Sequence, residues 1–178
     1  MLYSRRPPRA IREGLAWGIQ SPEHFQRFVE MDCDFSHEPQ AVMTGLGMLG
    51  PDVQVVLGSR YPNGTIIGWP RSRRIFSLFA NRLARVLLSG SVADYTNGFR
   101  FYTRETVEFI LRQPQKHKGY IYLSETLSYM LKQRFRIESF PIVFRNRARG
   151  VSNTTFREVR DALFGIVQIA WAYRFPRP

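Results

Sequence analysis

Residues 53–58, with the sequence Val-Gln-Val-Val-Leu-Gly, constrain the fold of this chain more than any other stretch. The run is short, β-branched and almost wholly apolar, as expected for a strand that is buried on both faces. Residues 60–70 are rich in Gly and Pro, which predicts a loop, and residues 71–88 then repeat apolar side chains at helical spacing. A buried strand that leads through a loop into a helix is the building unit of α/β folds.

The same alternation extends along the chain. Strands are predicted over residues 25–31 and 136–144 and after a turn within 94–102, and helices over residues 10–20, 40–49, 103–111, 123–133 and 155–175. The sequence therefore predicts an α/β chain with a mostly parallel central sheet. Residues 1–153 would form this domain, and residues 154–178 an amphipathic helix that follows it.

The charge of the chain restricts its partners. With 26 Lys and Arg against 14 Asp and Glu, the net charge is +12. Such a balance demands an anionic partner, such as a phosphorylated ligand, an anionic lipid or a nucleic acid. Nearly all of the basic residues are Arg, whose planar guanidinium binds phosphate through two hydrogen bonds, although a codon bias toward Arg would explain part of the excess.

The single cysteine, Cys33, predicts neither an internal disulfide nor a Cys-based zinc site. A reducing, cytosol-facing compartment fits this usage. Residues 1–12 are basic and contain Pro without an apolar segment, so we expect no signal peptide.

Asp32 and Asp34 follow the predicted strand of residues 25–31. Two carboxylates one residue apart at a strand end point to the same side and repel each other in water. A shared hard cation would relieve that repulsion and leave coordination positions for a phosphate. A solvated acidic turn is the alternative, and for this pattern alone it is the more common outcome. We interpret His37, just after the pair, as a supporting or loop residue rather than a metal ligand.

Residues 45–50, Gly-Leu-Gly-Met-Leu-Gly, match the G-x-G-x-x-G pattern of dinucleotide-binding proteins. That fingerprint requires a strand before it and a helix after it. Here a predicted helix precedes the glycines and a strand follows them, so we reject a cofactor-binding role for this motif.

Further polar residues follow the predicted strands or lie in the predicted loops. These residues are Arg60, Arg73, Asp94, Arg100, Arg147 and Ser152. Ligands of open α/β sheets bind at the carboxyl ends of the strands, so we expect Asp32, Asp34 and Arg60 to share one crevice. The combination predicts one metal site beside several guanidiniums that bind phosphate.

These motifs occur in a characteristic order. They are Asp32-Cys33-Asp34-Phe35-Ser36-His37, Gly58-Ser59-Arg60-Tyr61, Trp69 with Arg73 and Ser77, Asp94-Tyr95-Thr96-Asn97-Gly98-Phe99-Arg100, Lys118-Gly119-Tyr120 with Glu125, and residues 144–152. In combination they resemble the dolichol-phosphate mannosyltransferase group of family 2 glycosyltransferases, also called polyprenol-phosphate mannose synthases. The resemblance implies the Rossmann-like nucleotide-sugar transferase fold, GT-A.

The resemblance also implies roles for individual residues. Asp32 and Asp34 would hold Mg²⁺ or Mn²⁺ on the donor diphosphate, with Ser36 as a weaker third ligand. The residues that contact the phosphates, the donor and the sugar would be Arg60, Arg73, Arg100, Arg147, Ser152, Asp94 and Glu125. Among these residues and the metal ligands, Asp34, Asp94 and Arg60 would take part in catalysis.

The implied reaction is the inverting transfer of a sugar to polyprenyl or dolichyl phosphate, with GDP-mannose as donor and UDP-glucose as the variant. The acceptor oxygen is already anionic, so the reaction needs cations more than a general base. A membrane-bound acceptor would make the protein cytoplasmic and peripheral to the cytosolic face of a membrane.

The chain departs from the family pattern in two places. Ser152-Asn153 replaces a frequent Ser-Lys, which removes one cation near the phosphates. The family's first strands, which read the nucleotide base, are missing, so the chain would begin inside the donor-binding half. An inactive or partial transferase that acts as a binding partner therefore remains open.

Two further alternatives concern the partners. Residues 162–173 are apolar except for Gln168 and too few to span a bilayer, which takes about 20 apolar residues. That helix suits either a membrane interface or a place on the core. A nucleic-acid-binding module would explain the charge, but we expect no nucleic acid, because the basic residues lie in loops beside carboxylates and no recognition helix or zinc pattern is present.

Overall fold

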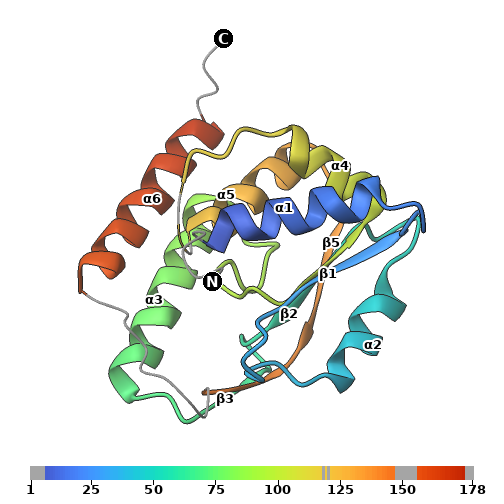
Figure 1. Ribbon diagram of the computed structural model, residues 1–178. Coiled ribbons are helices and arrows are strands. Elements are labelled where there is room, and N and C mark those ends of the chain that lie inside the picture. The colour runs from blue at the N-terminus through green and yellow to red at the C-terminus, as the bar shows by residue number, and fades with distance from the viewer. Residues whose placement is uncertain (1–6, 118, 120, 147–155, 175–178) are drawn as a thin grey trace, which may run out of the picture.

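The chain folds around a four-stranded sheet with helices on both faces (Figure 1). The computed structural model describes residues 7–117, 119, 121–146 and 156–174. Within them the strand order is β1-β4-β2-β5, with β1 Arg27–Glu30, β2 Val55–Ser59, β4 Arg100–Thr103 and β5 Ile137–Pro141. β2 runs parallel to β5, whereas β4 lies antiparallel to both β1 and β2.

The position of β4 corrects the prediction of a mostly parallel sheet. β1, β2 and β5 share one direction, as predicted, but two of the three strand pairings are antiparallel because β4 lies between β1 and β2. The first residue of β4, Arg100, pairs with Glu30, the last residue of β1. The turn that precedes β4 therefore stands at the same edge of the sheet as the loops that follow β1 and β2.

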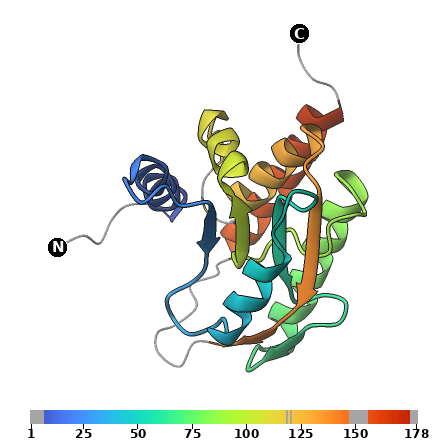
Figure 2. The same ribbon diagram turned by 90° about the vertical axis from the view of Figure 1, so that its right-hand side faces the viewer.

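Helices cover the two faces unequally. They are α1 Pro7–Gln20, α2 Gln40–Met48, α3 Arg71–Leu87, α4 Arg104–Arg112, α5 Ile121–Lys132 and α6 Phe156–Arg174. Side chains of β2 alternate between two cores: Val56 packs with Phe99 and Phe101 on the side of α2, while Val55 and Leu57 join the core beneath the other helices. Figure 2 shows α2 on its own side of the sheet.

Every predicted helix is present, with small shifts at the ends. α1 begins at Pro7 instead of residue 10, because proline is tolerated in the first helical turn, where its missing N–H would have no partner. Thr103 caps α4 as predicted, since its side chain accepts the N–H of Thr106. α2 contains Gly45, at which a Cβ atom would overlap the ring of Phe101. The glycine thus serves close helix–sheet packing, and α2 precedes β2 in the chain, which is the order on which the rejection of a dinucleotide loop is based.

A second, smaller sheet was not predicted. β3, Thr65–Ile67, lies within the expected loop of residues 60–70 and pairs in parallel with β6, Val143–Arg145. The partners lie far apart in the sequence, so no local pattern indicated the pairing. The expected strand of residues 136–144 is divided between β5 and β6.

α6 packs on the core, one of the two places expected for it, but only one side of the helix is buried. Ile166, Ile169 and Ala170 are buried, and the helix packs against α3 and α5. Phe164 and Trp171, on the other side, are 67% and 68% exposed. In the described part of the chain, no helix combines the length and apolar character needed to cross a membrane. The predicted domain boundary at residues 153 and 154 lies outside the described residues.

Candidate active site

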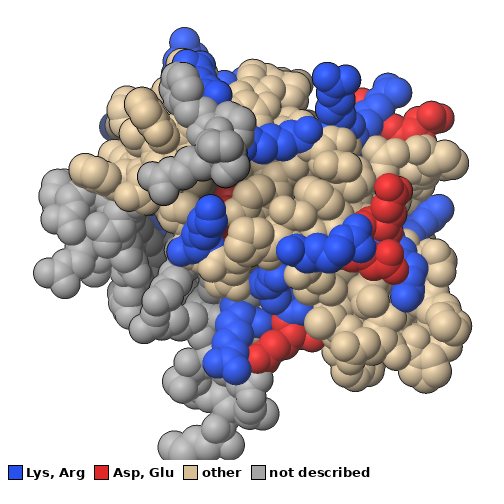
Figure 3. All heavy atoms as spheres, turned by 90° about the horizontal axis from the view of Figure 1, so that it is seen from above, with Lys and Arg blue, Asp and Glu red and all other residues tan. Residues whose placement is uncertain are grey.

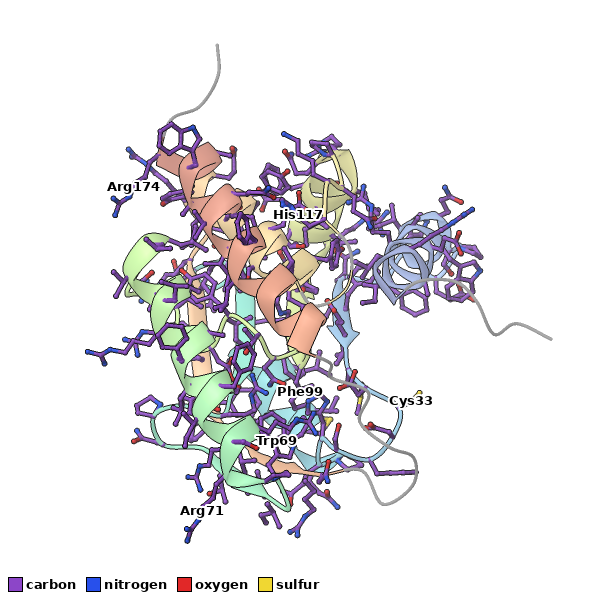
Figure 4. The ribbon with its side chains drawn as sticks, turned by 90° about the vertical axis from the view of Figure 1, so that its left-hand side faces the viewer. Cys33, Trp69, Arg71, Phe99, His117 and Arg174 are labelled. Atoms are coloured by element: carbon purple, nitrogen blue, oxygen red, sulfur yellow. The ribbon has the colours of Figure 1, made fainter. Side chains whose placement is uncertain are left out.

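The predicted site gathers where β1 and β2 end and β4 begins. The carboxylate loop, residues 31–37, follows β1, and Arg60 directly follows β2. The polar turn, residues 94–99, leads into β4. In Figure 4 the labelled Cys33, Phe99 and Trp69 mark this region. Ligands of α/β sheets bind in the crevice at the carboxyl ends of the strands, so the location agrees with the prediction.

Arg60 and Asp94 form a buried ion pair in this region. Arg60 Nε lies 2.8 Å from Asp94 Oδ2, Nη2 lies 3.0 Å from Oδ1, and the backbone N–H of Arg60 donates to Oδ2 at 3.1 Å. Arg60 is 6% exposed and Asp94 is 1% exposed. Burial alone would raise the pKa of Asp94, but the Arg60 guanidinium and the hydrogen bonds hold that pKa below its ordinary value. Both groups are therefore charged at neutral pH.

Arg60 also makes structural contacts with aromatic rings. Its Cζ lies 5.4, 5.6 and 5.7 Å from the ring centroids of Trp69, Tyr61 and Phe144. The guanidinium thus holds the Asp94 carboxylate in place, and its expected contact with a phosphate stays a prediction.

The carboxylate loop presents Asp32 and Asp34 to solvent. Asp34 Oδ1 accepts the N–H of Ser36 at 3.0 Å, and Phe35 between them has a φ of 60°, in the sparsely populated left-handed region. A Cβ atom on Gly98 would lie 3.9 Å from Asp32 Oδ1, so the Asp32 carboxylate stands beside the polar turn. Two carboxylates are thus held at the surface of one short loop.

His37 connects the carboxylate loop, which follows β1, to the polar turn and through it to β2. It is 1% exposed, and its ring stacks on Phe99 with centroids 4.8 Å apart. Nδ1 accepts the backbone N–H of Asp32 at 3.3 Å, so the proton is on Nε2, which lies 3.2 Å from Asn97 Oδ1. Asn97 Nδ2 in turn donates to the carbonyl of Gly58 at 2.6 Å. This position agrees with the interpretation of His37 as a supporting residue, whereas the sequence carried no signal for its partner Asn97.

The carboxylate loop fits a divalent cation that is shared with a substrate. Mg²⁺ commonly binds through one or two carboxylates and keeps its other positions for water and substrate phosphates. Asp32 and Asp34 supply such a pair, and among the residues that the structure describes no group of three His, Cys, Asp or Glu side chains could hold a metal ion. Among the described residues Ser36 Oγ has no hydrogen-bond partner, but Ser36 is only 2% exposed, which disfavours it as a third ligand in this conformation.

Arg73 lies at the edge of the site, at the start of α3. Its Cζ is 4.1 Å from the ring centroid of Trp69, and Nη1 donates to Asn146 Oδ1 at 3.5 Å. Trp69 Nε1 and the Tyr61 hydroxyl are buried without a hydrogen-bond partner in the described structure, a feature that no sequence motif indicated. Arg73 is half-buried, and its expected contact with a phosphate stays a prediction. The other predicted phosphate ligands, Arg147 and Ser152, lie outside the described residues.

Arg100 has a structural role in place of the predicted substrate contact. It is fully buried. Its guanidinium donates to the backbone carbonyls of Asn97 and Leu123 at 2.9 Å and of Tyr95 at 3.0 Å. These bonds tie the polar turn to the start of α5 and leave the guanidinium inaccessible to a ligand.

Glu125 also makes structural contacts. Its carboxylate accepts the backbone N–H groups of Lys116 and His117 at 3.1 Å each, and His117 Nδ1 lies 3.1 Å from Oε1. The hydrogen bond with Glu125 raises the pKa of His117 above its ordinary value, despite an opposing effect of burial. Figure 4 shows His117 beside α6, well apart from Cys33 and Trp69. Glu125 thus anchors the segment before α5, and its predicted place in the sugar pocket has no support from these contacts.

The arrangement of this sheet and its helices defines a class of protein. Glucosyl-3-phosphoglycerate synthase from Mycobacterium tuberculosis, solved with Mn²⁺, UDP-glucose and phosphoglyceric acid, has a TM-score of 0.64 at 18% identity and covers 99% of this chain and 58% of that chain. The same protein solved with Mg²⁺ and UDP gives the same values. At this identity the likeness shows the fold alone. The fold is the GT-A fold of nucleotide-sugar transferases, as the motifs predicted.

Two curated relatives are more closely similar in sequence. The polyprenol monophosphomannose synthase of Mycolicibacterium smegmatis is 33% identical over 166 residues, or 93% of this chain. The undecaprenyl-phosphate mannosyltransferase of Micrococcus luteus is 28% identical over 162 residues, or 91% of this chain. The chain spans 61% and 66% of the lengths of these relatives. No protein-family model matches it. The resemblance to polyprenol-phosphate mannosyltransferases is thereby confirmed over nearly the whole of this chain.

Proposed function

We propose that this chain serves an inverting transfer of mannose from GDP-mannose to polyprenyl or dolichyl phosphate. One observation carries the proposal: the exposed pair Asp32 and Asp34 and the buried pair Arg60 and Asp94 stand at one edge of a GT-A sheet. The similarity to two polyprenyl-phosphate mannosyltransferases supports the acceptor and the sugar.

Asp32 and Asp34 would hold Mg²⁺ or Mn²⁺. When bound, the cation would stabilise the negative charge of the leaving diphosphate. Solved GT-A neighbours that contain Mn²⁺ or Mg²⁺ together with UDP or UDP-glucose support this role, and they make UDP-glucose the second donor to test.

The other residues would position two anionic reactants. Arg73 and Arg147 would bind phosphate groups, and Asp94, kept charged by Arg60, would line the sugar pocket. A polyprenyl phosphate oxygen is already anionic, so the reaction needs no general base. His37 would not act as one, because both of its ring nitrogens are engaged in hydrogen bonds. Burial also lowers the pKa of His37. Attack on the face opposite the diphosphate would invert the anomeric centre.

Sugar transfer into extracted lipid tests the proposal. The chain is incubated with polyprenyl phosphate, a divalent cation and radiolabelled GDP-mannose or UDP-glucose. We expect label in the lipid with GDP-mannose, none with a chelator, and none for Asp34→Asn. Asp52→Asn, at another exposed aspartate, is the matched control. Equal transfer by Asp34→Asn and the unaltered chain would contradict the proposed site.

A second candidate function is an inactive transferase that binds the metal and the nucleotide sugar without transferring the sugar. Titration calorimetry with Mn²⁺ and GDP separates the two functions: binding without transfer supports a binding partner, and transfer excludes it.

A further inference from the structure

Asn97 lies at the centre of a hydrogen-bond network that joins the end of β2 to the carboxylate loop. Its Nδ2 donates to the backbone carbonyl of Gly58 at 2.6 Å, and its Oδ1 lies 3.2 Å from His37 Nε2. His37 Nδ1 in turn accepts the backbone N–H of Asp32 at 3.3 Å. Asn97 and His37 are both buried, so water does not compete for these bonds. We refer to these four residues as the Asn97 network.

Backbone groups at both ends fix the polarity of the Asn97 network. The N–H of Asp32 only donates, which makes His37 Nδ1 an acceptor and places the ring proton on Nε2. The carbonyl of Gly58 only accepts, which turns the amide nitrogen of Asn97 toward it and the amide oxygen toward His37. Asparagine meets both demands because its short amide group carries a donor and an acceptor. A leucine of similar size would meet neither.

Two aromatic rings enclose His37. Its ring stacks on Phe99 with centroids 4.8 Å apart and 12° between the planes, and it meets Phe144 edge-on at 5.3 Å. Figure 4 shows Phe99 within the fold and Cys33, next to Asp32 in sequence, at its surface. These apolar contacts fix the plane of the imidazole but carry no preference for either nitrogen. The tautomer is therefore set by the hydrogen bonds that the two ring nitrogens make.

The polar turn that carries Asn97 is itself held in place. Arg100 donates to the backbone carbonyls of Tyr95 and Asn97 at 3.0 and 2.9 Å. Gly98, the next residue, comes so close to the carboxylate loop that a Cβ atom on it would lie 3.9 Å from Asp32 Oδ1. The polar turn therefore stands beside the Asp32 carboxylate at Gly98 and holds the Asp32 main chain through Asn97 and His37.

The support of Asp32 differs from that of ordinary surface charges. On the surface seen in Figure 3, acidic residues lie among basic ones, where water and salt screen their interactions. Asp32 is also exposed, yet its backbone N–H is bound to a buried side chain. Groups that orient metal ligands from behind contribute about 10–100-fold to metal affinity. The Asn97 network has the position that such a contribution requires.

We propose that Asn97 is a positioning residue for the cation site: it sets the tautomer of His37, and His37 holds the carboxylate loop in the shape that binds a cation. The inference deepens the proposed function and rests on its metal site. Because Asn97 acts through His37, its replacement should lower the affinity for Mn²⁺ only while His37 is present.

Nitrogen NMR of the histidine rings tests the first half of the proposal without metal or substrate. The chain contains three histidines, so replacing each in turn assigns their signals. We expect His37 of the unaltered chain in the Nε2–H form. In Asn97→Leu the buried Nε2–H loses its acceptor, so the Nδ1–H form should become populated. An Nδ1–H form in the unaltered chain, a measurement that depends on no variant, would overturn the proposal, as would unchanged His37 signals in Asn97→Leu.

A double-mutant cycle tests the second half. Titration calorimetry with Mn²⁺ in the presence of GDP should show binding about tenfold weaker for Asn97→Leu and for His37→Ala. The combined variant should bind no more weakly than His37→Ala alone, because the two residues act in series. A change that merely loosened the fold would instead multiply with the first. Losses that multiply, or an unchanged affinity for Asn97→Leu, would overturn the proposal.

Gln54→Leu is the matched control. The Gln54 amide also bonds two backbone groups, the carbonyl of Pro51 and the N–H of Arg136, but at the other end of β2. Its loss should leave Mn²⁺ affinity unchanged, and circular dichroism confirms that each variant is folded. Mn²⁺ bound equally by the unaltered chain and Asn97→Leu would defeat this inference alone. An unaltered chain that shows the expected tautomer but binds no Mn²⁺ would contradict the proposed function, and Asn97 would then support only the fold.

Discussion

The aspartates of this site lie in two different environments, because one is buried and two are exposed to solvent. Asp94 is buried, receives three hydrogen bonds from Arg60 and keeps its charge because the guanidinium lies beside it. Asp32 and Asp34 are exposed and are held by a short loop whose backbone is fixed through His37 and Ser36. The difference teaches which charges serve the fold and which are presented to a ligand: a buried carboxylate needs a permanent partner, whereas an exposed pair can share a diffusible cation.

Removing one member of the buried pair should have the largest effect. Asp94→Asn leaves the Arg60 guanidinium buried without a counter-ion, so the free energy of unfolding should fall by about 3–5 kcal/mol. Urea denaturation followed by circular dichroism measures it. Asp52→Asn should change the same quantity by less than about 0.5 kcal/mol.

Replacing both partners sharpens this result. Arg60→Met with Asp94→Leu removes the uncompensated charge and should recover most of the lost stability, because apolar groups of similar volume often replace a buried ion pair without loss. Sugar transfer should stay absent if Asp94 acts in the sugar pocket. A double variant no more stable than Asp94→Asn would contradict the ion-pair explanation.

The exposed pair should behave in the opposite way. Asp32→Asn with Asp34→Asn should weaken Mn²⁺ binding by about 100-fold or more, since even the residues that support metal ligands contribute about 10–100-fold. Stability should change by less than about 0.5 kcal/mol, because both side chains are at the surface. Calorimetric titration with Mn²⁺ in the presence of GDP measures the affinity. An unchanged Mn²⁺ affinity would contradict the proposed metal site.

His37 joins the two environments, and its loss should produce an intermediate effect. His37→Ala leaves the Asp32 N–H and Asn97 Oδ1 without their partner, at a cost of about 1–3 kcal/mol in unfolding free energy. It should also weaken Mn²⁺ binding by about tenfold. His37→Gln, which keeps an acceptor and a donor, should recover part of both losses. His24→Asn, at an exposed histidine, should leave both unchanged.

The smallest expected effect is on the pH dependence of stability, because His117, the partner of Glu125, can lose its charge. The pKa of His117 is raised by its hydrogen bond with Glu125. Because the folded-state pKa of His117 lies above the unfolded one, this stabilisation is full below the ordinary histidine pKa of about 6.5 and is lost as the pH rises through the higher folded pKa. Stability should therefore decline by less than about 1 kcal/mol over that window, and His117→Gln should abolish the decline. Urea denaturation at a series of pH values detects it. A decline that persists in His117→Gln would assign it to another group.

Sequence patterns predicted the elements better than their pairing. The apolar run that became β2 and the helical periodicities were sufficient for six helices and an α/β class. The antiparallel position of β4 and the β3–β6 pair were missed, because β-pairing depends on which distant segment lies alongside. At the site, the motifs predicted that the carboxylate loop, Arg60 and Asp94 lie near one another, and the structure places them at one edge of the sheet. They did not reveal that Arg60 and Arg100 are buried or that Glu125 anchors another segment.

The sequence by itself determined which chemical groups this chain possesses, its excess of arginine and the order of motifs that relates it to polyprenol-phosphate mannosyltransferases. Only the tertiary structure decided how each charged group is used. Arg60 and Asp94 lie 34 residues apart and meet in a site from which solvent is excluded. Desolvation and the distance to a counter-charge set the role of an ionisable group, and both depend on neighbours from remote segments. For the same reason, the place of Asn97 became recognisable only once the fold had brought its side chain between Gly58 and His37.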